Sequence, residues 1–166
     1  MADCIEELGA SIERETGQWT NFGGREILTP PKGILDCGNS ATAAKILSFL
    51  VACFESPVVI DGDSSLRERD FTQLTKSLAD LGCKVSSNSL PLEITGPISG
   101  GRTSIDESVS SQVVTGLILA SAGLQKQIEV SLFGDAVSRW YRDLTIDICN
   151  DCGWPGRLDE LSLIHI

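Results

Sequence analysis

The chain has 166 residues, 42% of them hydrophobic and 22% charged, and a formal net charge of −10. This length and composition are those of one globular domain with a buried core, which excludes a disordered chain. The negative charge argues against nucleic-acid and anionic membrane partners, and the longest apolar run, residues 46–54, is too short to cross a bilayer, so we expect a cytoplasmic protein.

The predicted elements start with a helix at residues 4–8 and two strands near residues 11–15 and 25–29. A strand, an apolar helix, a strand ending in Gly-Asp, an amphipathic helix and two strands follow, at residues 33–38, 39–54, 57–63, 70–82, 83–88 and 91–96. The same order then returns as a strand, an apolar helix, a strand ending in Gly-Asp and a helix, at residues 102–106, 110–123, 127–135 and 143–153.

Two independent markers indicate that this order is an internal repeat. Helical patterns end at Gly9, Gly82 and Gly153, which lie 73 and 71 residues apart. The Gly-Asp pairs begin at Gly62 and Gly134, which lie 72 residues apart. We therefore predict an α/β fold, in the mixed α+β sense, of repeated βαβαββ units. About two and a third units are present, and the chain begins inside one, so we expect the fold to need the opening strand and helix of that unit.

Both apolar helices open with hydroxyl and amide side chains. The first opens with Asn39, Ser40, Ala41 and Thr42, and the second with Ser110, Ser111 and Gln112. Backbone N–H groups and the helix dipole make such a start an anion site. The alternative is that these residues only cap their helices, since Ser, Asn and Thr are ordinary cap residues.

Cations near the helix starts favour the anion site. Arg67 and Arg69 follow the first Gly-Asp pair, and Lys45 lies one turn into the first apolar helix. In a chain with 13 cations and 23 acids, this grouping predicts a clamp for phosphate or carboxylate. Glu68 favours the alternative of a solvated charge cluster. The corresponding loop of the second unit holds Ser138, Arg139, Tyr141 and Arg142.

The six cysteines follow no regular framework, and we interpret them as reduced structural residues. Cys149 and Cys152 form one C-x-x-C pair, and the single histidine is His165. A zinc site takes about four such ligands. We therefore predict no metal site.

These motifs carry a resemblance to a known family. The strings DCGNSATAAKIL, GDSSLRERDFTQLTKSLADLG, PLEITGPISGG, IDESVSSQVVTGLILA and GDAVSRWYRDLTIDI resemble, in order and separation, the first domain of the 5-enolpyruvylshikimate-3-phosphate synthase family. The resemblance covers about residues 1–154, and Ser-Ser-Gln followed by Ser-x-x-Tyr is its most specific part. It implies a fragment of the N-terminal domain of that family's inside-out α/β barrel.

The resemblance also implies a reaction of the shikimate pathway of aromatic amino acid biosynthesis, in which phosphoenolpyruvate gives its enolpyruvyl group to shikimate 3-phosphate without a cofactor. The implied ligands of shikimate 3-phosphate are Ser110, Ser111, Gln112, Ser138 and Tyr141. Those of phosphoenolpyruvate are Asn39, Ala41, Thr42, Lys45, Arg69 and Gln112. The resemblance further implies that the general acid and base belong to a second domain of the same protein. The isolated chain is therefore predicted to be inactive, with no catalytic residue of its own.

Four positions depart from the family pattern. Ala41 stands where the family has glycine, and its methyl is expected to crowd phosphoenolpyruvate and, by the same geometry, the inhibitor glyphosate. Lys45 replaces an arginine and loses the bidentate fork. Asp70 and Trp140 replace prolines. We predict a lowered affinity for phosphoenolpyruvate relative to family members.

Two other functions stay open. UDP-N-acetylglucosamine enolpyruvyl transferase shares GDSSL-R-like and GNS-T-like strings, although Ser110-Ser111-Gln112 argues against it. A non-catalytic substrate-binding remnant is favoured by Ala41 and Asp70. The last six residues, LSLIHI, continue no predicted strand or helix and match the translation of a transposon adapter, so we expect residues 155–166 to be a non-native tail.

Overall fold

The structure is a computed structural model that describes residues 1–22, 24, 27–121, 124, 126–136, 138–154, 156–158 and 163–165. The helices are α1 (Ala2–Glu7), α2 (Ala41–Val51), α3 (Ser64–Arg67), α4 (Thr72–Asp80), α5 (Ser111–Ser121) and α6 (Arg139–Asp151). The strands of the first half are β1 (Ser11–Glu15), β2 (Gln18–Phe22), β3 (Leu35–Asp36), β4 (Val58–Asp61), β5 (Lys84–Val85) and β6 (Leu92–Thr95). Those of the second half are β7 (Gly101–Asp106), β8 (Ile128–Phe133), β9 (Arg157–Leu158) and β10 (Leu163–His165).

Two four-stranded sheets share one topology. Their strand orders are β3-β4-β6-β5 and β7-β8-β10-β9. In each sheet the first two strands are parallel and the remaining pairs are antiparallel. The predicted βαβαββ order and the mixed α/β class are therefore confirmed. Helix α1 and the antiparallel β1–β2 hairpin precede the first sheet, in the order that α4, β5 and β6 repeat. The count of units stays a prediction.

The structure differs from the sequence-based elements at the N-terminal hairpin and after β4. The second N-terminal strand is Gln18–Phe22. Residues 25 and 26 of the predicted strand lie outside the described residues, and residues 27–29 form no strand. Gly17, at φ 84°, allows a two-residue turn that pairs Glu15 with Gln18. Helix α3 was not predicted; Asp63 begins it by accepting a hydrogen bond from the Leu66 N–H (2.8 Å).

The expectation that the last residues join no strand is wrong. β10 pairs with β8, in the place that β6 takes beside β4 in the first sheet. Whether residues 155–166 are native stays a prediction.

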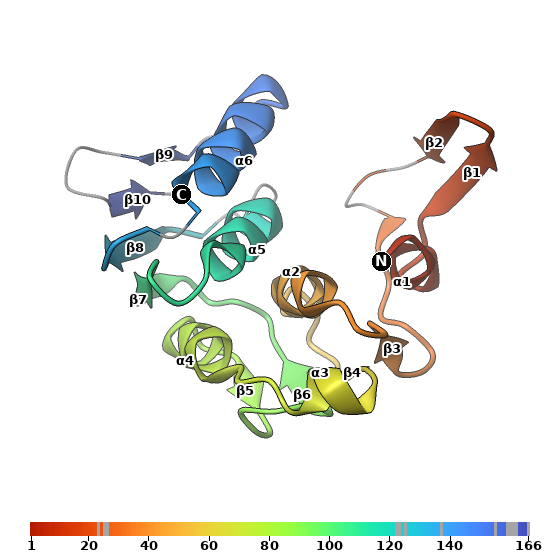
Figure 1. The fold of residues 1–166 in the computed structure, drawn as a ribbon, viewed down its shortest axis with the longest axis horizontal. Coiled ribbons are helices and arrows are strands. Elements are labelled where there is room, and N and C mark those ends of the chain that lie inside the picture. Colours follow the sequence, from red (N-terminus) through yellow and green to blue (C-terminus); the bar gives the residue numbers. More distant parts are fainter. Residues whose placement is uncertain are drawn as a thin grey trace.

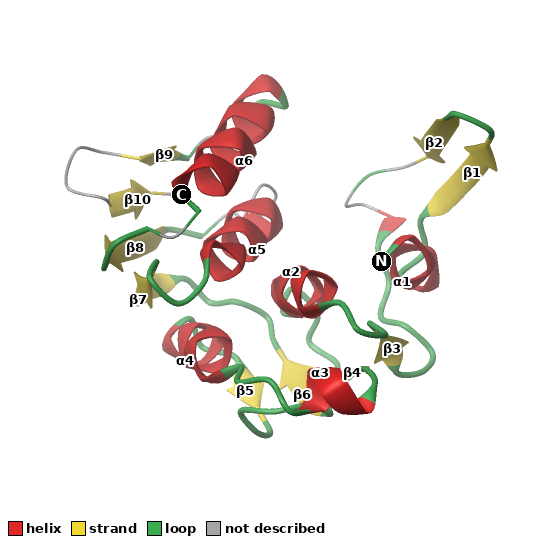
Figure 2. Ribbon diagram, viewed as in Figure 1, coloured by secondary structure: helices red, strands yellow, loops and turns green. Residues whose placement is uncertain are grey.

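The core centres on the two apolar helices. Helices α2 and α5 lie side by side in the middle of an arc, with the sheets toward its outer edge (Figures 1 and 2). Gly116 on α5 is needed for this approach. A Cβ there would lie 3.0 Å from the Lys45 carbonyl oxygen and 2.9 Å from the Phe49 ring. Because the helices pack this closely, their N-terminal ends, where anion sites were predicted, are neighbours.

Candidate functional site

A cavity of about 320 Å³ lies at the N-terminal end of α2. Its lining consists of Asn39, Ser40, Ala41, Thr42, Lys45, Arg69, Asp70, Phe71 and Gln112. The six residues that the resemblance assigned to phosphoenolpyruvate are all in this set. Residues up to 73 positions apart in sequence thus form one hollow, with Gln112 contributed by the second unit.

Local hydrogen bonds explain why α2 begins at this cavity. The Ser40 hydroxyl accepts from the Ala43 N–H (3.1 Å) and caps the helix. The Asn39 side chain donates to the Asp63 carboxylate (2.8 Å), which ties the helix start to the Gly-Asp loop. N–H groups in the first turn of a helix have no intrahelical acceptor and carry its positive dipole end. The cavity therefore opens onto a helix end suited to an anion.

Two cations add to this positive end. Lys45 and Arg69 both line the cavity, and neither forms an ion pair with any described residue. Burial lowers the pKa of the Lys45 ammonium, and the charge of Arg69 lowers it further. Cations without an ion-pair partner among the described residues, in a chain of net charge −10, indicate a site for an anion.

Arg67 does not belong to the predicted clamp. Its Nε and Nη2 donate to the two Asp61 carboxylate oxygens (2.9 and 2.6 Å). This bidentate bond holds the pKa of Asp61 below its ordinary value. Asp61 ends β4, and the single turn of α3 brings Arg67 back to it. Within the Arg-x-Arg sequence, only Arg69 lines the cavity.

Asp70 lines the cavity but its carboxylate is already engaged. It accepts hydrogen bonds from the Thr72 hydroxyl and from the Thr72 N–H (2.9 Å). These bonds lower the pKa of Asp70. Asp70 therefore serves the start of α4, and it opposes the neighbouring cations only in part.

Two hydrogen bonds join the starts of α2 and α5. Gln112 Nε2 donates to the Thr42 hydroxyl (2.7 Å), and Lys45 Nζ donates to the Ser110 hydroxyl (3.0 Å). Ser110 also accepts from the Gln112 N–H (3.2 Å). The cavity lysine thus touches a serine that the resemblance assigned to shikimate 3-phosphate.

The other predicted ligands of shikimate 3-phosphate lie in two places. Ser111 begins α5 and is buried. Ser138 is the N-cap residue of α6, yet its hydroxyl makes no capping bond. Tyr141 lies in the first turn of α6 with 69% of its surface exposed. None of the three lines the cavity at α2.

A sequence profile of the family described as EPSP synthase (3-phosphoshikimate 1-carboxyvinyltransferase) matches residues 1–157. The chain belongs to the EPSP synthase family. A 3-phosphoshikimate 1-carboxyvinyltransferase of Halobacterium salinarum is 35% identical over 158 residues, which are 92% of this chain and 36% of that relative. One from Caldivirga maquilingensis is 38% identical over 154 residues, which are 90% of this chain and 35% of that relative. The chain thus spans about a third of the length of these relatives.

A solved structure of EPSP synthase from Acinetobacter baumannii matches 99% of this chain and 37% of its own chain. The TM-score is 0.84 at 24% sequence identity. This likeness shows that the fold is shared.

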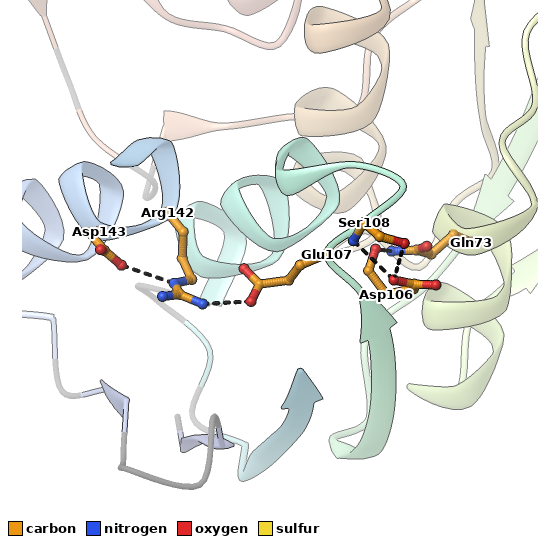
Figure 3. Close-up of polar contacts among 6 residues, drawn as sticks. All are labelled: Gln73, Asp106, Glu107, Ser108, Arg142 and Asp143. Atoms are coloured by element: carbon orange, nitrogen blue, oxygen red, sulfur yellow. Dashed lines mark hydrogen bonds and ion pairs between the residues drawn. The ribbon is translucent and has the colours of Figure 1, made fainter. Parts of the chain in front are cut away.

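The sequence analysis did not predict one buried ion pair of this EPSP synthase family member. Arg142 on α6 donates through Nη1 to Glu107 Oε2 (2.6 Å), and the side chains of both residues are 5% exposed (Figure 3). Arg142 was noted only as part of its loop, and Glu107 gave no signal, since charged residues are ordinarily exposed.

The described residues contain no group of three or more His, Cys, Asp or Glu side chains arranged to hold a metal. Cys149 is buried, Cys152 is exposed, and both thiols are free. Burial raises the pKa of Cys37 to about 12 and that of Cys83 to about 11, so these thiols stay protonated and unreactive near neutral pH. Across the described part of the chain, no helix has the length and apolarity needed to cross a bilayer.

Proposed function

We propose that this chain forms the part of a cytoplasmic 3-phosphoshikimate 1-carboxyvinyltransferase that holds the substrate anions. The observation that carries the proposal is the cavity at the start of α2, where Lys45 and Arg69 lie without ion-pair partners among the described residues. Each charge-assisted hydrogen bond from such a cation to an oxyanion contributes about 1.5–3 kcal/mol. Phosphoenolpyruvate, with a phosphate and a carboxylate, matches two cations and a helix end.

Shikimate 3-phosphate is assigned to the second unit. Ser110, Ser111 and Ser138 are to donate to its phosphate, while Tyr141 lies against the ring and Gln112 reaches both ligands. In the reaction, a proton adds to the methylene carbon of phosphoenolpyruvate, and the 5-hydroxyl oxygen bonds to its C2 and loses its proton. Loss of a methyl proton then expels phosphate and restores the double bond.

We assign the groups that move these protons to a second domain. The 166 residues span about a third of the relatives, so on their own they are proposed to bind the substrate groups without turnover. The second domain, closing over the cavity, is the partner that this proposal requires.

Calorimetric titration of the chain with phosphoenolpyruvate tests the assignment. Arg69→Gln and Lys45→Met are each expected to weaken binding by about 10-fold or more. Lys76→Met is the matched control, since its ammonium pairs with Asp80 outside the cavity lining (2.7 Å). Equal affinities of parent and both cavity variants would exclude the proposed anion site. Binding of both substrates, combined with no turnover in the full-length protein, would favour the non-catalytic remnant.

A further inference from the structure

We propose that the buried Glu107–Arg142 ion pair positions the loop before α5 against the first turn of α6. This contact aligns Ser110 and Ser111 with Ser138, the serines assigned to shikimate 3-phosphate. The inference rests on the proposed function. Glu107 lies in the loop before α5, which begins at Ser111, and Arg142 lies in the first turn of α6, shortly after its N-cap residue Ser138. The 2.6 Å bond between Arg142 Nη1 and Glu107 Oε2 therefore joins the two segments directly.

The remainder of the loop is already fixed from the other side. The Asp106 carboxylate accepts from the N–H and the hydroxyl of Ser108 (2.9 and 2.6 Å). The Asp106 carbonyl accepts from Gln73 Nε2 on α4 (3.1 Å). Figure 3 shows this turn on one side of Glu107 and Arg142 on the other. The ion pair thus anchors the loop to the element that carries Ser138.

Both partners are held in place by further bonds. The Glu107 N–H donates to the carbonyl of Phe133 at the end of β8 (2.9 Å). Arg142 Nε donates to the Asp143 carboxylate (3.0 Å). An arginine with two charged partners keeps its planar fork in one orientation. The geometry of the pair is therefore transmitted to both backbone segments.

The first unit shows that the fold does not need an ion pair here. By backbone pairing, Cys37 takes the place of Glu107: its N–H donates to the carbonyl of Asp61 at the end of β4 (2.8 Å), as that of Glu107 does to Phe133. Counted back from the glycine after each helix, Phe71 takes the place of Arg142. Both first-unit residues are buried and apolar in character.

The ion pair is also incompletely satisfied. Glu107 Oε1 is buried without a hydrogen-bond partner among the described residues. Apolar residues of similar volume commonly equal or exceed a buried ion pair in stability, and orientation is the better-attested gain from keeping one. Stability alone does not account for charges at these two positions.

The test transplants the first-unit residues into the second unit, as Glu107→Cys with Arg142→Phe in one variant. The expected result is a thermal midpoint at or above that of the parent, with binding of shikimate 3-phosphate weakened by about 10- to 100-fold, the loss typical of a small misplacement of binding groups. Arg142→Lys alone keeps the charge, and this variant is expected to bind shikimate 3-phosphate more tightly than the transplanted variant does, though less tightly than the parent. The matched control is Asp61→Asn with Arg67→Met, which removes the ion pair of the first unit and is expected to leave this affinity unchanged.

Amide NMR spectra separate this inference from the proposed function. The transplanted variant is expected to shift and broaden the amide signals of Ser110, Ser111 and Ser138, with those of Asn39 and Arg69 unchanged. If the parent chain does not bind shikimate 3-phosphate, the proposed function fails for this chain and these signals alone decide the positioning role. Unshifted serine signals, or an unweakened affinity in a folded variant, would overturn it.

Discussion

The two units use nearly the same backbone to present different side chains. After β3 the Gly38 N–H donates to the Asp36 carboxylate (2.8 Å), and after β7 the Ser108 N–H donates to that of Asp106 (2.9 Å). The next helix starts at an open cavity with two cations in the first unit, and beside buried and capping serines in the second. The two sheets thus share one topology, and the two units differ in the side chains that they carry at equal positions.

The ion pairs of the two units differ in the same way. The Arg67 side chain, paired with Asp61, is 51% exposed, whereas that of Arg142, paired with Glu107, is 5% exposed. Water solvates the first arginine if its partner is lost, but it does not reach the second. The contribution of each pair to stability therefore depends on burial and not on the bond lengths, which are equal at 2.6 Å.

The helices that follow these pairs contrast as well. Helix α4 packs against β7, where its Asp80 accepts from the Thr103 hydroxyl (2.9 Å). On α6, Trp140, Leu144 and Ile148 form an apolar stripe that is 85%, 54% and 53% exposed. Equal position in a repeat does not imply equal burial, since burial depends on the neighbour.

The largest expected effect comes from breaking the buried pair. Arg142→Met leaves Glu107 as a buried, unpaired carboxylate and is expected to lower the free energy of unfolding by about 3–5 kcal/mol. Urea denaturation measures the change. Asp61→Asn in the first unit is expected to cost far less, because the arginine that it leaves unpaired, Arg67, has a side chain that is 51% exposed and stays hydrated. Equal losses in the two variants would contradict the contrast between the units.

Separating the two units at their shared core is expected to have the next largest effect. Gly116→Val places methyl groups against the Lys45 carbonyl and the Phe49 ring, and is expected to cost about 1–3 kcal/mol of stability. It also pushes apart the Lys45–Ser110 and Gln112–Thr42 bonds, so phosphoenolpyruvate binding falls with it. Gly33→Ala is the control, because a Cβ there meets no atom within 4 Å. A Gly116→Val protein of parental stability would show that the close approach is not needed.

The pH dependence of anion binding sharpens the role of the first unit. An anion binds the protonated form of Lys45, whose pKa is lowered by burial and by Arg69. Affinity for phosphoenolpyruvate is therefore expected to be full at pH values below that pKa and to fall about tenfold as pH rises through it. The fall begins at lower pH than the ordinary lysine pKa of 10.5 would allow. The affinity of Lys45→Arg for phosphoenolpyruvate is expected to stay constant over the same pH range. A matching fall in this variant would show that a group other than Lys45 causes the pH dependence.

The smallest effect is expected at the cavity wall. Ala41→Gly removes the methyl group that lines the cavity, and is expected to tighten phosphoenolpyruvate binding several-fold in the full-length protein, about 1 kcal/mol. Calorimetry compares the two affinities directly. Binding by Ala41→Gly no tighter than by the parent would show that this methyl does not crowd the ligand.

The sequence by itself located most of the elements and several residues of the cavity. Helical spacing, Gly-Asp ends and a period near 72 residues are local or periodic signals, and they located most of the helices and strands. Asn39, Lys45 and Arg69 were identified because cations and cap residues gathered near one helix start. Such signals need no knowledge of distant contacts.

Only the tertiary structure decided which charges are free and which are paired. Arg67 and Arg69 cannot be told apart by their sequence context. In the structure, α3 places Arg67 against Asp61, whereas Arg69 lines the cavity. Glu107 and Arg142 are 35 residues apart, and their burial depends on α5 and α6 packing together. The reason is physical, because desolvation and ion pairing depend on distances across the fold, which no local pattern of residues encodes.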